Sequence, residues 1–294
     1  MAVLTSGGIS SVAIALLTRQ LVLPQTVTAI PGDEFAGSNG DTITVRVPQP
    51  SASRTQDNPG DTLVADEVDE VPVTVQVNHL YHLKNVSDQQ LSLEIEDFAR
   101  QITRPQTEAV AVGAEDQVAS VMNGAEASLS IADDGSNIEE VILEARERLG
   151  RANVPATDRW FAVSPEVATF VMGVDKFVRV DASGNDAALR ESVIGRLYGF
   201  TFVESAGLNS GRAMAYHRSG FAWANRVPVT PRGATDSSAA NAHGVGIRHV
   251  FQYNANTAQD QSLISTFAGA AAVYEDQPSQ SDNRRWIAID TEGS

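Results

Sequence analysis

Cysteine is absent from the 294 residues, and lysine occurs only twice, at Lys84 and Lys176. Without cysteine the chain can form neither a disulfide nor a cysteine-ligated metal site, which fits a reducing compartment such as the cytosol. Long hydrophobic runs are also missing, because the apolar patch from Val12 to Leu17 is too short to span a bilayer. The composition therefore favours neither a membrane protein nor a disulfide-stapled secreted domain.

Histidine is scarce as well, with five residues in the chain. His79 and His82 lie three apart in an extended stretch, so they should face opposite sides, whereas a zinc site needs three or four converging ligands. The sequence also lacks a nucleophile elbow, a phosphate-binding loop and a dinucleotide fingerprint. We therefore predict no catalytic, cofactor-binding or metal residue and expect no enzyme, although abundant carboxylates leave a carboxylate-dependent hydrolase open.

The charge balance is strongly acidic, with 37 acidic and 21 basic residues and a formal net charge of −16. Such a surface repels nucleic-acid backbones and anionic membranes, so DNA binding is not expected as a primary activity. Nearly all basic residues are arginines, which suit ion pairs with carboxylates between packed surfaces. Codon usage in a high-GC genome explains the arginine excess equally well.

The most informative segment covers residues 41–77. Thr42–Val47 and Val71–Val77 alternate apolar and polar residues, which predicts two strands with one apolar face each. The stretch between them, 48–70, is polar, proline-bearing and acidic, as expected for a long loop. Because a two-stranded ribbon is marginal in water, we expect its apolar face to lie on a surface of another molecule.

A long helix should follow this ribbon. Ser87 and Gln90 have the spacing of a capping box, and an apolar stripe continues from there. The pattern predicts a helix over 88–123, which Pro105 should kink or split.

The rest of the chain predicts a short N-terminal helix and a mixed α+β body. Residues 12–21 should form the helix, which Leu23-Pro24 should end. The further expected elements are a helix capped by Asn137, a strand Trp160–Val163, a helix from Pro165 to Met172, a strand Gly199–Val203, a strand pair Ala213–His217 and Phe221–Asn225, a loop 227–244, and two long strands, 245–254 and 262–274.

Three stretches carry a resemblance to a known family. Gly40–Pro48, Ile194–Ser205 and Ser262–Tyr274 resemble the start of the extended loop, a strand of the axial domain and the closing peripheral strand of tailed-bacteriophage major capsid (coat) proteins. This shell fold is shared with herpesvirus capsids and bacterial nanocompartments. The order of elements is also similar, most closely to the coat-protein branch of actinobacterial phages that does not cross-link. The loop 48–70 contains no lysine and has Arg54 as its basic residue, so we expect no isopeptide cross-links.

The resemblance implies an α+β fold in five parts. These are an N-terminal arm (1–36), an extended loop (37–79), a peripheral domain with a spine helix (80–135), an axial domain (136–244), and a strand pair that returns to the peripheral domain with a C-terminal tail (245–294).

It also implies a structural protein that self-assembles into an icosahedral capsid around double-stranded DNA. The implied partners are further copies in pentamers and hexamers, a scaffolding protein and a portal, with DNA enclosed without sequence-specific binding, no membrane and no cofactor. Assembly is expected in the host cytoplasm and the final location in the virion. The candidate inter-subunit contacts are Val12, Leu16, Ile43, Val45, Arg54, Asp66, Glu67, Val73 and Val75.

Three alternatives stay open. A nanocompartment shell would enclose a cargo enzyme instead of a genome, and a carboxylate-dependent hydrolase would show turnover as a small particle. A phage tail or decoration protein would usually be shorter and would lack the long helix.

Overall fold

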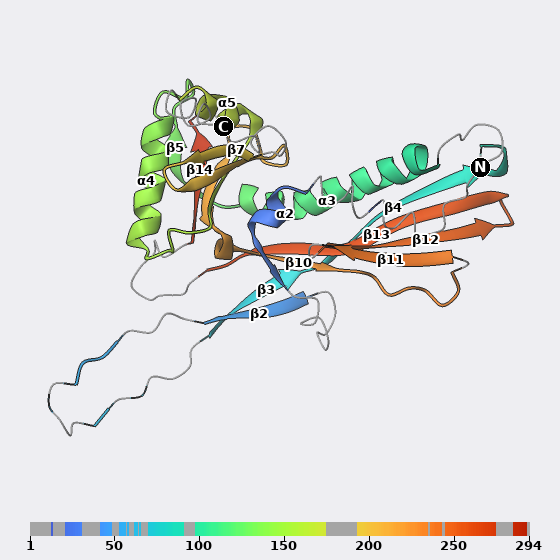
Figure 1. The fold of residues 1–294 in the computed structure, drawn as a ribbon, viewed down its shortest axis with the longest axis horizontal. Coiled ribbons are helices and arrows are strands. Elements are labelled where there is room, and N and C mark those ends of the chain that lie inside the picture. Colours follow the sequence, from blue (N-terminus) through green and yellow to red (C-terminus); the bar gives the residue numbers. More distant parts are fainter. Residues whose placement is uncertain are drawn as a thin grey trace.

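The computed structural model describes residues 13, 21–30, 42–48, 53–56, 58, 62–63, 65, 70–90, 98–174, 193–234, 236–242, 245–274 and 285–292. These residues form two bodies, each built on a six-stranded sheet, and a separate two-stranded ribbon. Figure 1 shows one long, flat body, one rounder body beside it, and the ribbon below the flat body.

The flat body contains β1 (Thr28–Ile30), β4 (Asn78–Ser87), β10 (Phe221–Arg226), β11 (Asp236–Ala242), β12 (Val245–Asn254) and β13 (Gln259–Ala272). The strand order is β1-β10-β13-β12-β11. Strand β4 pairs with the edge of β13 that lies opposite β12. The two long strands β12 and β13 confirm the expected antiparallel pair.

Helix α3 (Arg104–Asn123) lies along one face of this sheet (Figure 1). Its buried residues Val110, Ala114 and Val118 recur every four residues, so one stripe packs on the sheet. Pro105 lies in the first turn of this helix, directly after a helical turn of another type, so the helical segment is interrupted at this proline as the sequence predicted. A π-helical turn, η3 (Ala99–Thr103), precedes it.

The capping box is confirmed. The Ser87 N–H donates to Gln90 Oε1 at 3.1 Å, and the Gln90 N–H donates to Ser87 Oγ at 3.2 Å. Residues 91–97 of the expected helix lie outside the described residues.

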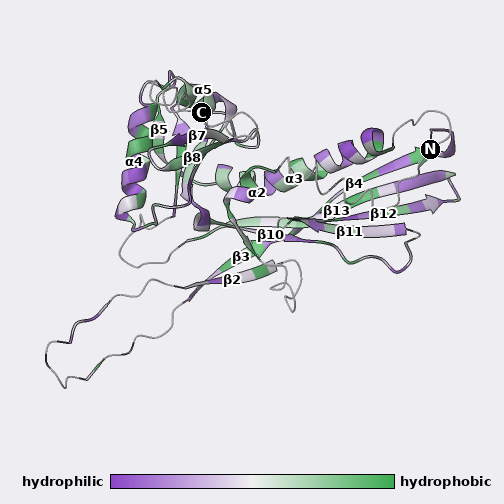
Figure 2. Ribbon diagram, viewed as in Figure 1, coloured by the Kyte–Doolittle hydropathy of each residue, from purple (hydrophilic) through white to green (hydrophobic). Residues whose placement is uncertain are grey.

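The rounder body contains β5 (Ala127–Ile131), β6 (Arg159–Val163), β7 (Val193–Leu197), β8 (Phe200–Glu204), β9 (Ala213–His217) and β14 (Trp286–Thr291), in the order β5-β14-β9-β6-β8-β7. Helices α4 (Ile138–Arg151) and α5 (Pro165–Met172) belong to this body (Figure 1). Hydrophobic and hydrophilic residues alternate along α3 and α4 (Figure 2), and the predicted apolar face of α4 is buried. Asn137 holds the cap position, but its Oδ1 accepts from the Ala132 N–H instead of capping the helix.

The prediction that β9 and β10 pair with each other is wrong. Both strands exist, but β9 pairs with β6 and β14, whereas β10 pairs with β1 and β13 in the other sheet. The 3₁₀ turn η4 (Arg218–Gly220) carries the chain from one body to the other. Local turn chemistry predicted a hairpin, but pairing partners on both edges of each strand decided otherwise.

Two further expectations need correction. Residues 236–242, which we expected in a loop, form β11, because the exposed edge of β12 supplies ladder partners that override weak strand propensity. Strand β14, which falls in the expected C-terminal tail, joins the rounder body, where it pairs with β5 and β9.

The N-terminal segment also departs from the expectation. Of the helix expected over 12–21, residues 12 and 14–20 lie outside the described residues, and Pro24 lies in the first turn of the short helix α2 (Leu23–Thr26). β1 then adds to β10 in parallel, and Leu21, Leu23 and Val27 are buried in the main core. Residues 21–30 are therefore an integral part of the fold.

Candidate functional site

The predicted ribbon is confirmed as β2 (Thr42–Pro48) and β3 (Glu70–Gln76), two antiparallel strands. The register pairs Ile43 with Val75 and Val45 with Val73, which places these residues on matching faces. At the far end Arg46 and Glu70 form an ion pair of 3.5 Å that is exposed and hence weak.

The base of the ribbon is buried within its own chain, which corrects a central expectation. Ile43, Val73 and Val75 are 3%, 6% and 0% exposed, and they share a core cluster with Ala222 and Ala224 of β10. Those three side chains are therefore not free to contact another copy.

The chain path explains this burial. A single residue, Val77, separates β3 from β4, so the ribbon must begin directly over the sheet. Its backbone crosses β13 at Gly269, where an added Cβ would lie 2.0 Å from the Gln76 carbonyl oxygen. Ala222 and Ala224 of β10 and Ala271 of β13 have small side chains, against which Ile43, Val73 and Val75 pack. The alternating pattern predicted the apolar face, but it carried no information about which surface covers it.

The loop between the two strands remains a candidate contact. Leu63 in this loop is 76% exposed, and residues 53–56, which include Arg54, are exposed as well. The predicted contacts Val12, Leu16, Asp66 and Glu67 lie outside the described residues, as does the side chain of Val45. For these, the assignment to an interface stays a prediction.

A second exposed apolar surface lies on the sheet face that α3 does not cover. Tyr81 and Leu83 of β4 are 63% and 47% exposed. In the antiparallel register Leu83 is paired with Leu263, so the two side chains share this face. We name the group Tyr81, Leu83 and Leu263 the open-face patch.

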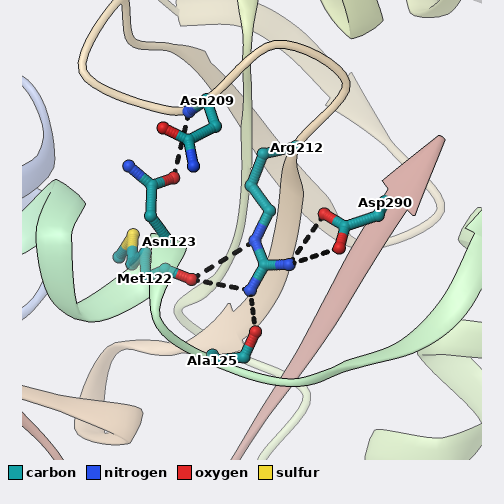
Figure 3. Close-up of polar contacts among 6 residues, drawn as sticks. All are labelled: Met122, Asn123, Ala125, Asn209, Arg212 and Asp290. Atoms are coloured by element: carbon teal, nitrogen blue, oxygen red, sulfur yellow. Dashed lines mark hydrogen bonds and ion pairs between the residues drawn. The ribbon is translucent and has the colours of Figure 1, made fainter. Parts of the chain in front are cut away.

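A buried arginine joins the two bodies (Figure 3). Arg212 Nη1 donates to both carboxylate oxygens of Asp290 at 2.7 Å, and Nη2 donates to the carbonyl oxygens of Met122, at 2.9 Å, and Ala125. Beside it the Asn209 N–H donates to Asn123 Oδ1 at 3.0 Å. The guanidinium thus fixes the end of α3, whose last carbonyls lack helical partners, to the rounder body.

A half-buried carboxylate fixes the N-terminal segment. Glu115 on α3 accepts hydrogen bonds from the backbone N–H groups of Val22 and Leu23, at 3.0 and 3.1 Å, and from Ser205 Oγ at 2.7 Å. Burial raises the pKa of Glu115 above its ordinary value, and these hydrogen bonds oppose that rise. One side chain therefore links the N-terminal segment, α3 and the loop after β8.

The two histidines of β4 lie on opposite faces, as expected. His79 packs on Phe267 with ring centroids 4.9 Å apart, whereas the backbone of His82 contacts Gln106 of α3. Over the described residues, no group of three or more His, Asp or Glu side chains could hold a metal ion. Among the described helices, none has the length and apolar character needed to cross a membrane.

Comparison with known proteins supports the fold through structure alone. No protein-family model matches the sequence, and no curated protein matches it. A structure from Mycobacterium phage Che8 superimposes with a TM-score of 0.60 at 21% identity and covers 92% of this chain and 90% of its own. The capsid of cyanophage P-SCSP1u gives 0.61 at 12% identity over 93% and 89%.

The virus-like particle of Pyrococcus furiosus gives a TM-score of 0.57 at 10% identity, over 96% of this chain and 97% of the other. Coverage near the full length of both chains means that the flat body, the rounder body and their connection are matched together. The chain therefore has the α+β fold of phage capsid proteins.

Proposed function

We propose that the chain is the structural subunit of an icosahedral phage capsid that encloses double-stranded DNA. The observation that carries the proposal is the match to phage capsid structures over about nine-tenths of both chains. The proposal gives the chain no catalytic role. Its final location is the virion, and its assembly takes place in the host cytoplasm.

The proposed partners are further copies of the chain, in pentamers and hexamers, together with a scaffolding protein and a portal during assembly. The five-part division made from the sequence is retained in the proposal, except that residues 21–30, β5, β10, β11 and β14 join the bodies in which they pair. DNA is held without sequence-specific contacts, because the charge of −16 disfavours binding to phosphates.

Contacts between copies are proposed to involve the loop 48–70 and the open-face patch. Leu63 leaves three-quarters of its surface in water within one chain, and Tyr81 and Leu83 are similarly unburied. Such apolar side chains form the buried centre of an interface, while charged residues such as Arg54, Asp66 and Glu67 suit its polar rim.

Sedimentation of purified protein tests this contact. Leu63→Asp should shift the population from shells to small oligomers, because a buried carboxylate at an interface centre is costly. Leu63→Met keeps the apolar surface and serves as the matched control, with shells retained. Normal shells from the Leu63→Asp variant would contradict the role of the loop.

The match to a virus-like particle is also compatible with a second candidate, a nanocompartment shell that encloses a cargo enzyme. Nuclease treatment of native particles separates the two. A capsid protects genome-length DNA, whereas a nanocompartment yields a cargo protein and no protected DNA.

A further inference from the structure

A polar layer lies beneath the first turns of α3. Gln106, fully buried, donates its side-chain amide to the carbonyl oxygens of Ser262 and His82, at 2.8 and 3.2 Å. The Ser262 hydroxyl donates to Gln106 Oε1 at 2.8 Å and lies 3.0 Å from His249 Nε2. Gln106 therefore attaches α3 to β4 and β13 by polar contacts, and Ser262 extends the network to His249 of β12. Farther along, the helix packs through apolar residues.

These contacts determine the tautomer of His249, that is, which ring nitrogen carries the proton. Gln106 Nε2 donates to two backbone carbonyl oxygens, which identifies it as the amide nitrogen. The atom that faces the Ser262 hydroxyl is therefore the amide oxygen Oε1, which can only accept. The single hydroxyl proton of Ser262 is then used on Gln106, and His249 Nε2 must donate to Ser262 Oγ. In the neutral ring, Nδ1 of His249 then carries the lone pair, and in the part of the chain that the structure describes it has no hydrogen-bond partner.

A second imidazole lies close by in the sheet. The register pairs both His82 and His249 with Ile264, from either side, so the two rings share the face that α3 covers. His82 Nδ1 is also buried and unpartnered, as judged over the described residues. The charged group acting on His249 is Asp236 of the edge strand β11, and α3 presents the neutral Gln106.

The helix is irregular at this same place. The π-helical turn η3 immediately precedes α3, and this helix type is rare and forms mostly as short bulges. Thr103, at the end of that turn, has a buried hydroxyl without a partner among the described residues. Besides the polar layer, the apolar side chains that hold this end are Ile102, which is 5% exposed, and Phe98, whose ring centroid lies 6.0 Å from that of Phe251.

We propose that this layer is a proton-sensitive latch: protonation of His249 at Nδ1 releases the first turns of α3, with η3, from the sheet. Among the described residues, the added N–H and charge would face neutral groups from the helix and the Asp236 carboxylate from the edge strand. Opening the site to water, or rotating the ring toward Asp236, solvates that charge and breaks the bond to Ser262. The latch is a property of the single chain and does not depend on the proposed function.

Hydrogen–deuterium exchange of the full chain tests the latch. Between pH 7 and pH 4.5, after correction for the intrinsic exchange rate, amides of residues 98–110 should lose protection at least tenfold more than those of α4. His249→Gln keeps a side-chain N–H for Ser262 but cannot titrate, so it should abolish that difference. His82→Gln is the matched control and should respond as the unmodified chain does.

Equal loss of protection in α3 and α4, or a response that survives His249→Gln, would overturn the proposal. A measurement without any substitution covers the case in which the variant does not fold. The pH dependence of deuterium uptake at the His249 ring carbon gives its titration midpoint in the intact protein. A midpoint below pH 5.5 supports the latch, and a midpoint of 6.5 or higher contradicts it.

Discussion

At the scale of single residues, Arg212 stabilises the connection between the two bodies more through the geometry of its hydrogen bonds than through its charge. Its planar fork serves one carboxylate and two main-chain carbonyls at once, and its side chain is only 5% exposed. Removing one partner of such a site leaves the others buried and unpaired. The connection between the two bodies is therefore sensitive to changes at this one position.

Arg212→Met should lower the free energy of unfolding by about 3 kcal/mol, because Asp290 and the Met122 carbonyl lose their donor. Chemical denaturation measures this change. The control Arg148→Met removes an exposed ion pair with Glu144 and should cost less than about 1 kcal/mol. Similar losses for both variants would show that the burial of Arg212 is unimportant.

His249 should make stability depend on pH. Burial lowers the pKa of His249 to about 4, whereas the unfolded chain has the ordinary value near 6.5. Its contribution is thus present above pH 6.5 and is lost as the pH falls toward 4, by up to about 3 kcal/mol.

Urea denaturation of the unassembled subunit at pH 7.5 and pH 4.5 should show this slope, and His249→Gln should reduce it. Glu115 acts in the opposite sense, because its raised pKa stabilises the fold at low pH. Because Glu115 is present in both the unmodified protein and the His249→Gln variant, the difference between their slopes excludes its contribution. An unchanged slope in the variant would remove His249 as the cause.

At the scale of elements, the crossing of the ribbon over β13 depends on Gly269. Gly269→Ala should destabilise the fold by about 1–3 kcal/mol, because the new methyl group would overlap the Gln76 backbone. Gly150→Ala in α4 meets nothing within 4 Å and should raise stability by about 0.5–1 kcal/mol. Thermal unfolding distinguishes the two, and a neutral Gly269→Ala would show that the ribbon can shift freely.

The elements also show what sequence patterns can and cannot predict. Local signals succeeded where one element determines its own structure, as in the Ser87–Gln90 capping box and the α4 stripe. They failed where a distant partner decides, as for β11, which owes its ladder to β12. Neither Arg212 nor Glu115 stood out in the sequence, because a buried charge looks like any surface charge until the fold brings its partners together.

The ribbon shows the same limit. Its alternating valines predicted an apolar face correctly, but Ile43, Val73 and Val75 are covered by Ala222 and Ala224 of β10, far later in the chain. The candidate contact surface consequently moves outward, from the base of the ribbon to the loop that contains Leu63.

At the scale of the whole molecule, the two bodies are joined by contacts from several segments. Arg212 holds the end of α3, Glu115 holds the N-terminal segment, and η4 carries the chain across. This arrangement suits the proposed shell subunit, because the described core residues are buried within one copy while Leu63 and the open-face patch remain uncovered. Interfaces between copies then require only moderate burial at each contact.

Cryo-electron microscopy of the purified full-length protein tests the central claim most directly. The account predicts closed icosahedral particles in which the loop carrying Leu63 lies against a neighbouring subunit. Monomers under every assembly condition, with that loop packed on its own chain, would contradict it.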